Sequence, residues 1–99
     1  MRKRYVYFIK EKIGMYAPVK IGYATDVQRR LDDLQIGNSR TLEIVATIGP
    51  ITLEHAKAIE IGLHDKFRKH RIRGEWFTGV VLNKLDSISE PLSTERIEP

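Results

Sequence analysis

The run from Tyr5 to Lys10, which reads Tyr-Val-Tyr-Phe-Ile-Lys, restricts the fold of this chain more than any other segment. Aromatic and β-branched side chains in close succession suit a pleated strand that is largely buried. Residues 11–17 contain Gly14 and end before Pro18, and residues 19–21 then resume an extended pattern, which predicts a β-hairpin. We therefore expect the chain to begin with a hairpin that other elements cover.

A first helix is predicted over residues 26–36. Thr25 or Asp26 can accept hydrogen bonds from the free N–H groups of its first turn, and Gly37 can end it in a left-handed conformation. Apolar residues repeat at helical spacing along one side: Val27, Leu31 and Leu34. This stripe should face the sheet.

A third strand and a longer second helix are predicted next. Apolar and mostly polar residues alternate over 41–48, a strand pattern that ends at Gly49-Pro50. Thr52 can cap a helix that extends to about His70, with a buried stripe made of Ala56, Ile59, Leu63 and Phe67. Residues 80–88 are consistent with a short closing helix.

The order β-β-α-β-α, with the short last helix added, predicts an α+β fold in which helices cover a small three-stranded sheet, mixed or antiparallel. A length of 99 residues supports one domain with one modest core. We expect this domain to span residues 1–88. Residues 89–99, with two prolines and few apolar side chains, are expected to form a flexible tail.

Composition excludes several classes of protein. The chain has no cysteine, so disulfides and thiolate metal sites are ruled out. No apolar run approaches the roughly 20 residues of a membrane helix, and the apolar residues 5–9 are too few for a signal peptide. The histidines show no zinc-site spacing. We therefore expect a soluble, cytoplasmic protein.

The positive charge is concentrated in the folded part. The net charge is +4, but the segment from Asp86 onward carries −3, which leaves +7 on residues 1–85. Such a surplus favours a polyanionic partner, because neutralised phosphates release their counterions. The densest basic stretch is predicted to make sequence-independent contacts with nucleic-acid phosphates, although some of its side chains will only be solvated: Lys66, Arg68, Lys69, Arg71 and Arg73.

Several short motifs follow one another along the chain. Tyr5-Val6-Tyr7 and Lys20-Ile21-Gly22 lie on the two predicted strands of the hairpin. Arg30 lies eight residues after Gly22, and Glu60 lies on a later predicted helix, followed by Leu63-His64 and Gly74–Phe77. This order resembles the GIY-YIG endonuclease superfamily, and within it the small phage-type branch, whose first and second triplets are similar to the two strand motifs. The chain departs from the pattern at Tyr5, which replaces glycine, and at Lys20, which replaces tyrosine. No residue aligns with the superfamily's late asparagine.

The resemblance implies a metal-dependent DNA endonuclease with Mg²⁺ or Mn²⁺ as its cofactor, in a bacterial or phage-infected cell. Glu60 would hold the metal ion, and Arg30 would hold the scissile phosphate through its planar guanidinium. Tyr7 would orient or deprotonate the attacking water. Lys20 would lower the pKa of that phenol or act as base itself, and His64 could be a supporting partner, a base or the acid for the leaving group. The choice of base stays open.

Ordinary structural explanations exist for each of these residues. Glu60 could form a surface ion pair with Lys57, Tyr7 could simply belong to the core, and Lys20 could be a solvated edge lysine. Arg29 matches Arg30 in composition, although Arg30 lies closer to the apolar stripe of its helix. His64 beside an apolar stripe is more often structural than catalytic.

Three functional classes follow. In the first, an endonuclease of low intrinsic sequence specificity acts on DNA, because the chain has no room for a recognition domain and a partner protein would have to supply specificity. In the second, the fold binds nucleic acid without cutting it. In the third, it is a protein-interaction domain. The substrate structure and the oligomeric state stay open at this level.

Overall fold

An antiparallel sheet forms the centre of the protein, in a computed structural model that describes residues 2–14 and 16–94. Within these residues the sheet has five strands in the order β3-β1-β2-β5-β4. The strands are β1 (Arg4–Glu11), β2 (Val19–Ala24), β3 (Leu42–Ile51), β4 (Arg71–Arg73) and β5 (Trp76–Phe77). The predicted hairpin is present as β1 and β2, with Tyr7 opposite Gly22.

The prediction of a three-stranded sheet was wrong, and so was the predicted order of elements. The sheet continues past β2 because β5 pairs with Val19 and Lys20, and β4 pairs with β5. β4 and β5 have only three and two residues. Segments this short carry no readable alternation of side chains, so their pairing is visible only once the chain is folded.

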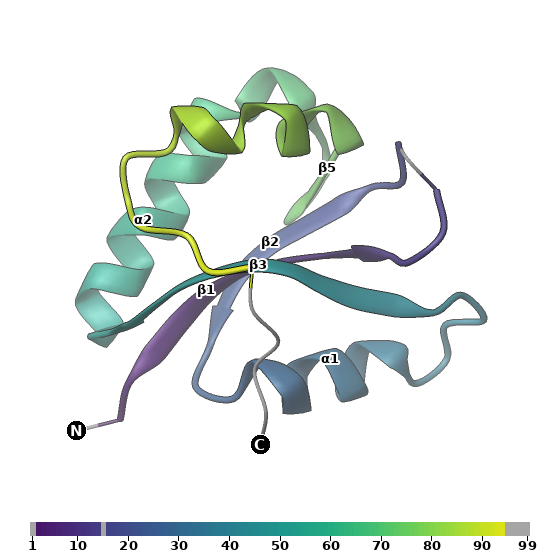
Figure 1. The fold of residues 1–99 in the computed structure, drawn as a ribbon, viewed down its shortest axis with the longest axis horizontal. Coiled ribbons are helices and arrows are strands. Elements are labelled where there is room, and N and C mark those ends of the chain that lie inside the picture. The colour runs from purple at the N-terminus through teal and green to yellow at the C-terminus, as the bar shows by residue number, and fades with distance from the viewer. Residues whose placement is uncertain (1, 15, 95–99) are drawn as a thin grey trace.

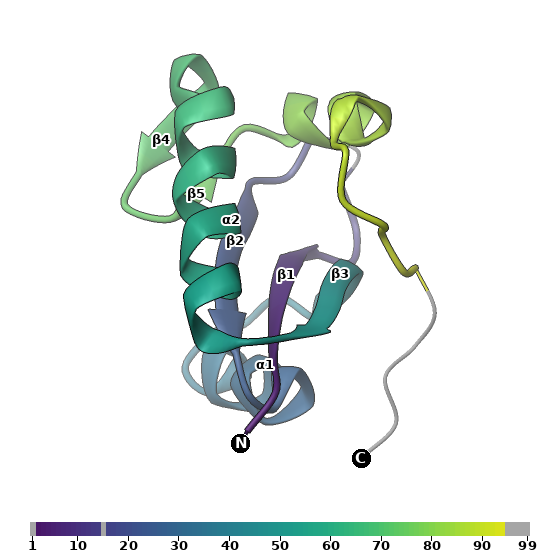
Figure 2. The same cartoon turned by 90° about the vertical axis from the view of Figure 1, so that its left-hand side faces the viewer.

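Helices lie on both sides of the sheet (Figure 1). α1 (Val27–Gln35) packs below it in this view, and α2 (Leu53–Lys66) lies on the opposite side with the 3₁₀ segment η2 (Gly79–Ser87). Figure 2 shows α2 running alongside the part of the sheet where β2, β5 and β4 lie. α2 ends at Lys66, earlier than predicted, and is followed by a short 3₁₀ turn, η1 (Arg68–His70). The closing helix predicted over residues 80–88 is a 3₁₀ helix.

Both α-helices begin at side-chain caps. The Asp26 carboxylate accepts a hydrogen bond of 3.0 Å from the Arg29 backbone N–H, which starts α1. The Thr52 hydroxyl oxygen accepts one of 3.2 Å from His55 and starts α2. Each cap satisfies a backbone donor that has no partner within its own helix. The caps therefore set where residues along each helix point, including Arg30 and Glu60.

The alternation of β1 divides the buried side chains between the two faces. Val6 and Phe8 belong to the larger core cluster, which lies against α2 and η2, whereas Tyr7 and Ile9 belong to a smaller cluster with Val27 of α1. The unbroken apolar run of β1 is explained by this double burial, since helices cover both faces of the strand. Tyr7 is thus directed toward α1, on the same side as Lys20 and Gly22, because residues paired across antiparallel strands share a face.

The described C-terminal residues return to the sheet. Ser93 and Thr47 of β3 exchange two backbone hydrogen bonds of 2.8 Å. The rest of the predicted tail, residues 95–99, lies outside the described residues. The Cα radius of gyration of 12.6 Å is that of a compact domain. Among the described residues, no helix combines the length and the apolar character needed to cross a membrane.

Candidate active site

Gly22 in β2 allows a buried tyrosine to pass beside the strand. A Cβ atom at this position would lie 2.5 Å from the Tyr7 hydroxyl oxygen and 2.8 Å from its Cζ. It would also lie 3.2 Å from Oε1 of Glu75. The missing side chain therefore leaves the space in which the Tyr7 hydroxyl and the Glu75 carboxylate approach the same point of β2.

Arg30 of α1 contacts the same hydroxyl. Its Nε donates a hydrogen bond of 3.3 Å to the Tyr7 oxygen, while Arg29 is exposed. Burial raises the pKa of Tyr7, against the opposing effect of the Arg30 hydrogen bond and charge. Tyr7 is therefore a neutral phenol at neutral pH. Since only Nε is used in this bond, the two terminal nitrogens of the Arg30 guanidinium are left for another acceptor.

Lys20 is held by two neighbours from the β4–β5 hairpin. Only 8% of this lysine is exposed. Its Nζ lies 3.1 Å from Oε1 of Glu75 and 5.2 Å from the centroid of the Trp76 ring. The Glu75 carbonyl oxygen accepts a backbone hydrogen bond of 3.0 Å from Ile21, which fixes the turn against β2. Lys20 is therefore a buried, paired ammonium and not a solvated edge lysine.

Glu75 is a site residue that sequence reasoning missed. It was read only as part of the Gly74–Phe77 ending, because nothing local connects it with Lys20, 55 positions earlier. Gly74, with a φ of +53°, allows the tight turn that directs Glu75 toward β2. The only sequence signal was an acidic residue placed between a turn glycine and two aromatic residues.

Glu60 and His64 project from α2 toward the same strand. His64 Nε2 donates a hydrogen bond of 3.0 Å to the Ile21 carbonyl oxygen, and its ring contacts the edge of Phe77. Oε2 of Glu60 is buried without a hydrogen-bond partner, and within the described residues Glu60 forms no ion pair with Lys57. Burial and the charge of Glu75 raise the pKa of Glu60, whereas His64 and Lys20 lower it.

These side chains form one electrostatic cluster around β2. The Tyr7 hydroxyl is influenced by the charges of Arg30, Glu75 and Glu60, and the Glu60 carboxylate by those of Glu75, His64 and Lys20. All the residues predicted for the site are therefore brought together: Tyr7, Lys20, Arg30, Glu60 and His64. Among the described residues, the cluster offers a carboxylate oxygen without a hydrogen-bond partner, a second carboxylate, the outer edge of a guanidinium and a neutral phenol. The same residues include no group of three or more histidine and acidic side chains placed to hold a metal ion.

The predicted phosphate-binding residues do not share one helix face. Lys66 donates a hydrogen bond to the Ser87 carbonyl, Arg68 pairs with Asp65 at 3.6 Å, and Arg71 donates to the Gly74 carbonyl. Within the described part of the chain, the side chains of Lys69 and Arg73 have no hydrogen-bond or ion-pair partner, so these two are the most available for an external phosphate.

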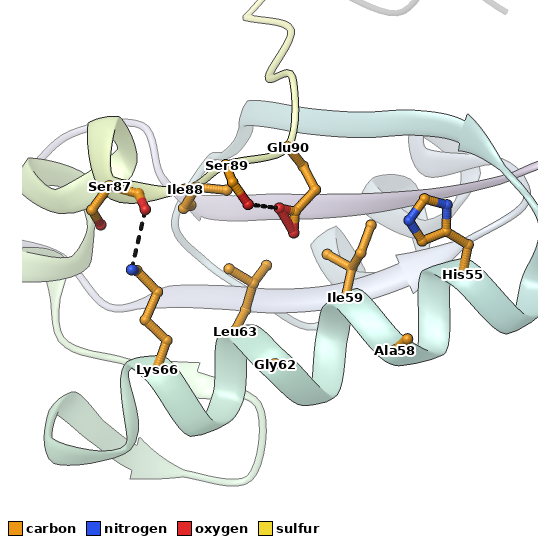
Figure 3. A pocket seen from close by; sticks show the side chains of 10 residues that line it. All are labelled: His55, Ala58, Ile59, Gly62, Leu63, Lys66, Ser87, Ile88, Ser89 and Glu90. Carbon is orange, nitrogen blue, oxygen red and sulfur yellow. Dashed lines mark hydrogen bonds between the residues drawn. The ribbon is translucent and has the colours of Figure 1, made fainter.

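A separate hollow of about 380 Å³ lies along α2 (Figure 3). Ile59 and Leu63 form its apolar wall, and Glu90, which accepts a hydrogen bond from Ser89, lies on the opposite side. Neither Glu60 nor His64 lines it. This hollow is therefore not part of the cluster around β2.

Comparison with known proteins gives one family. A family model described as the T5orf172 domain matches residues 4–92. No curated protein and no solved structure matches the chain. The matching family is not the one predicted from the sequence, so the assignment to the GIY-YIG superfamily was wrong. That assignment depended on two three-residue motifs, each with one departure, and motifs this short recur in unrelated buried strands.

Proposed function

The chain belongs to the T5orf172 domain family, and because that description states no activity, we propose a function from the residues around β2: metal-dependent hydrolysis of DNA phosphodiester bonds. The observation that carries the proposal is that Arg30 donates to the Tyr7 hydroxyl while Glu60, whose buried Oε2 has no hydrogen-bond partner among the described residues, acts electrostatically on the same hydroxyl. Cutting a phosphodiester requires charge neutralisation on the phosphate, a positioned water and a proton for the leaving oxygen.

Arg30 is the proposed phosphate ligand. Its Nε is held by Tyr7, and α1 is held by the Asp26 cap, so the guanidinium is fixed in orientation before a substrate arrives. The two terminal nitrogens can then donate to two oxygens of one phosphate, a geometry that lysine cannot provide. Glycine at position 22 is essential to this arrangement, because Tyr7 reaches Arg30 only across that residue.

Glu60 fits a divalent cation. A buried carboxylate oxygen with no hydrogen bond is costly for the free protein, and a hard cation would remove that cost. The charge of Glu75 raises the pKa of Glu60, so a bound cation would be attracted by both carboxylates. Mg²⁺ or Mn²⁺, when bound, supplies Lewis-acid stabilisation of the phosphate and lowers the pKa of water.

Tyr7 is assigned the positioning of the attacking water and not its deprotonation. Its pKa is raised by burial, and a neutral phenol that accepts from Arg30 can still donate its own proton to a water oxygen. His64 uses Nε2 to donate to the Ile21 carbonyl, which leaves Nδ1 as the ring nitrogen that can accept a proton. Lys20, paired with Glu75, contributes positive charge beside the phosphate.

DNA is the proposed partner, bound with low sequence specificity. The excess positive charge supports contacts with the phosphate backbone, as do Lys69 and Arg73, which have no side-chain partner among the described residues. Such contacts carry no sequence information. We place this activity in the cytoplasm, where DNA is accessible. A non-catalytic DNA-binding domain is the second candidate, favoured by the Lys20–Glu75 ion pair, which neutralises one carboxylate of the site.

Supercoiled plasmid tests the proposal. Wild-type protein with Mg²⁺ should nick the plasmid, and Glu60→Gln should reduce nicking to background. Glu54→Gln, an exposed glutamate on the same helix, is the matched control and should keep wild-type activity. Equal nicking by wild type and Glu60→Gln would refute the site. Wild-type protein that binds plasmid without nicking it would favour the second candidate.

A further inference from the structure

A hollow of about 480 Å³ lies on the α1 side of the sheet, beside the cluster just described. Pro18, Leu42, Ile72 and Trp76 supply apolar surface, and Asn38 and Arg73 supply polar groups. Its position follows from the register of the sheet: Trp76 is paired with Lys20, and Lys20 with Ile9, so all three side chains point to the same face. The volume is within the usual range of ligand pockets.

Trp76 joins this hollow to the cluster around β2. Its ring lies under the Lys20 ammonium and at the same time lines the hollow, and it is only partly buried. Ile72, on the adjoining strand β4, leaves 54% of its surface exposed. An indole and an isoleucine side by side in water form an apolar surface that a flat, apolar ligand would cover.

The charges around the hollow favour an anionic chain. Arg73 lines it and has no ion-pair or hydrogen-bond partner among the described residues, and Arg71 lies on the same short strand. The one carboxylate in the lining, Glu11, is paired with Arg40 at 3.6 Å. A ligand that combines a flat aromatic ring with a phosphate therefore matches the hollow better than an uncharged apolar one.

We propose that this hollow holds an unpaired nucleobase of the DNA strand, stacked on Trp76, with the adjoining phosphate at Arg73. The proposal rests on the proposed nuclease function and names its substrate class: DNA with an unpaired nucleotide near the bond to be cut. A base inside a duplex is stacked on its neighbours and would first have to be extruded, at a cost of free energy. Stacking on an aromatic ring tolerates any base, which agrees with low sequence specificity.

Fluorescence tests this assignment directly, because Trp76 is the only tryptophan in the chain. Glu60→Gln protein in EDTA is titrated with a 12-nucleotide oligothymidine and with an abasic strand of the same length. The base-bearing strand should quench Trp76 emission to saturation and bind about 5- to 150-fold more tightly than the abasic strand. A blunt duplex should behave like the abasic strand. Equal affinity and equal quenching by all three would overturn the proposal.

A substitution gives a second, independent measurement. Ile72→Ala removes exposed apolar surface and should weaken anisotropy-detected binding of labelled oligothymidine, with no effect on the abasic strand. Ile61→Ala, at an isoleucine of α2 that is 69% exposed and outside the hollow, is the matched control and should change neither affinity. An equal loss of affinity for oligothymidine and for the abasic strand would contradict base stacking.

The outcomes separate this proposal from the nuclease function. Both binding measurements are made without a divalent cation, so discrimination between strands can be seen even if the protein does not cut DNA. Plasmid nicking that depends on Glu60, together with no preference for base-bearing strands, would refute the nucleobase site and leave the nuclease intact.

Discussion

Gly22→Ala should disrupt the fold and the proposed site together. The added methyl group would lie 2.5 Å from the Tyr7 hydroxyl oxygen and 2.8 Å from its Cζ, well inside van der Waals contact. Tyr7 cannot swing away freely, because it is 1% exposed, packed with Ile9 and Val27, and bonded to Arg30. Overpacking of this kind costs about 1–3 kcal/mol. The lower entropy of the unfolded chain offsets about 0.4–1 kcal/mol of that.

The expected net loss is therefore on the order of 1–2 kcal/mol of unfolding free energy. For a domain of this size, each kcal/mol corresponds to about 4–8 °C in Tm. Gly62→Ala is the matched control, since no atom lies within 4 Å of the Cβ position at Gly62 and the residue is inside α2. Alanine should stabilise the helix there by about 0.5–1 kcal/mol.

Urea denaturation followed by circular dichroism measures the change in unfolding free energy of each variant relative to wild type. Plasmid nicking, at a temperature where each variant is folded, measures the effect on the proposed site. Gly22→Ala should lose nicking because Tyr7 is displaced from Arg30, whereas Gly62→Ala should keep it. The reasoning is refuted if Gly22→Ala is as stable and as active as Gly62→Ala.

Three further predictions concern Glu60, the α1 cap and the basic surface. Because the pKa of Glu60 is raised in the folded state, wild-type protein should lose stability as pH rises from about 4 through that pKa; Glu60→Gln should lack this loss and be more stable at pH 7. Thermal unfolding of both proteins between pH 4 and 8 measures this difference, and an identical dependence of Tm on pH for wild type and Glu60→Gln would contradict the raised pKa. Asp26→Ala should cost about 1 kcal/mol in urea denaturation, because the Arg29 N–H loses its acceptor, and Asp26→Asn should retain most of that stability. Arg73→Ala should reduce the salt slope of DNA binding by about 1, whereas Arg68→Ala, at a residue paired with Asp65, should reduce it less. Equal slopes for the two variants and wild type would exclude Arg73 from the DNA contact.

Elements that depend on local interactions were predictable. The aromatic and β-branched run of β1 and the helix caps, predicted at Thr25 or Asp26 and at Thr52, act between residues that are close along the chain. β3 was predicted to end at Gly49-Pro50 but continues to Ile51, and a register shift against β1 places its alternating apolar residues in two different core clusters. The helix predicted over residues 26–36 is observed as Val27–Gln35. The same local logic failed for β4 and β5, because strands of three and two residues owe their conformation to pairing with a distant strand.

The candidate site likewise combines residues that were predicted from the sequence with one, Glu75, that was not. Arg30 and Glu60 were predicted from the resemblance, and Arg30 also from its place beside the apolar stripe of its helix. The structure brings both into one cluster with Tyr7, Lys20 and His64. The family was misassigned, because short motifs in buried strands are too common to identify one. The spacing of residues along the chain also gave no reason to place Glu75 in the site.

What the sequence by itself determined is a buried first strand and the starts of the two α-helices, since strand propensity and caps are properties of neighbouring residues. Only the tertiary structure decided that β5 pairs with β2. That pairing brings both Glu75 and Trp76 to the Lys20 ammonium. Burial raises the pKa of Tyr7 and of Glu60. These shifts cannot be derived from any one segment of the sequence, because burial and the approach of charges arise only when distant segments pack together.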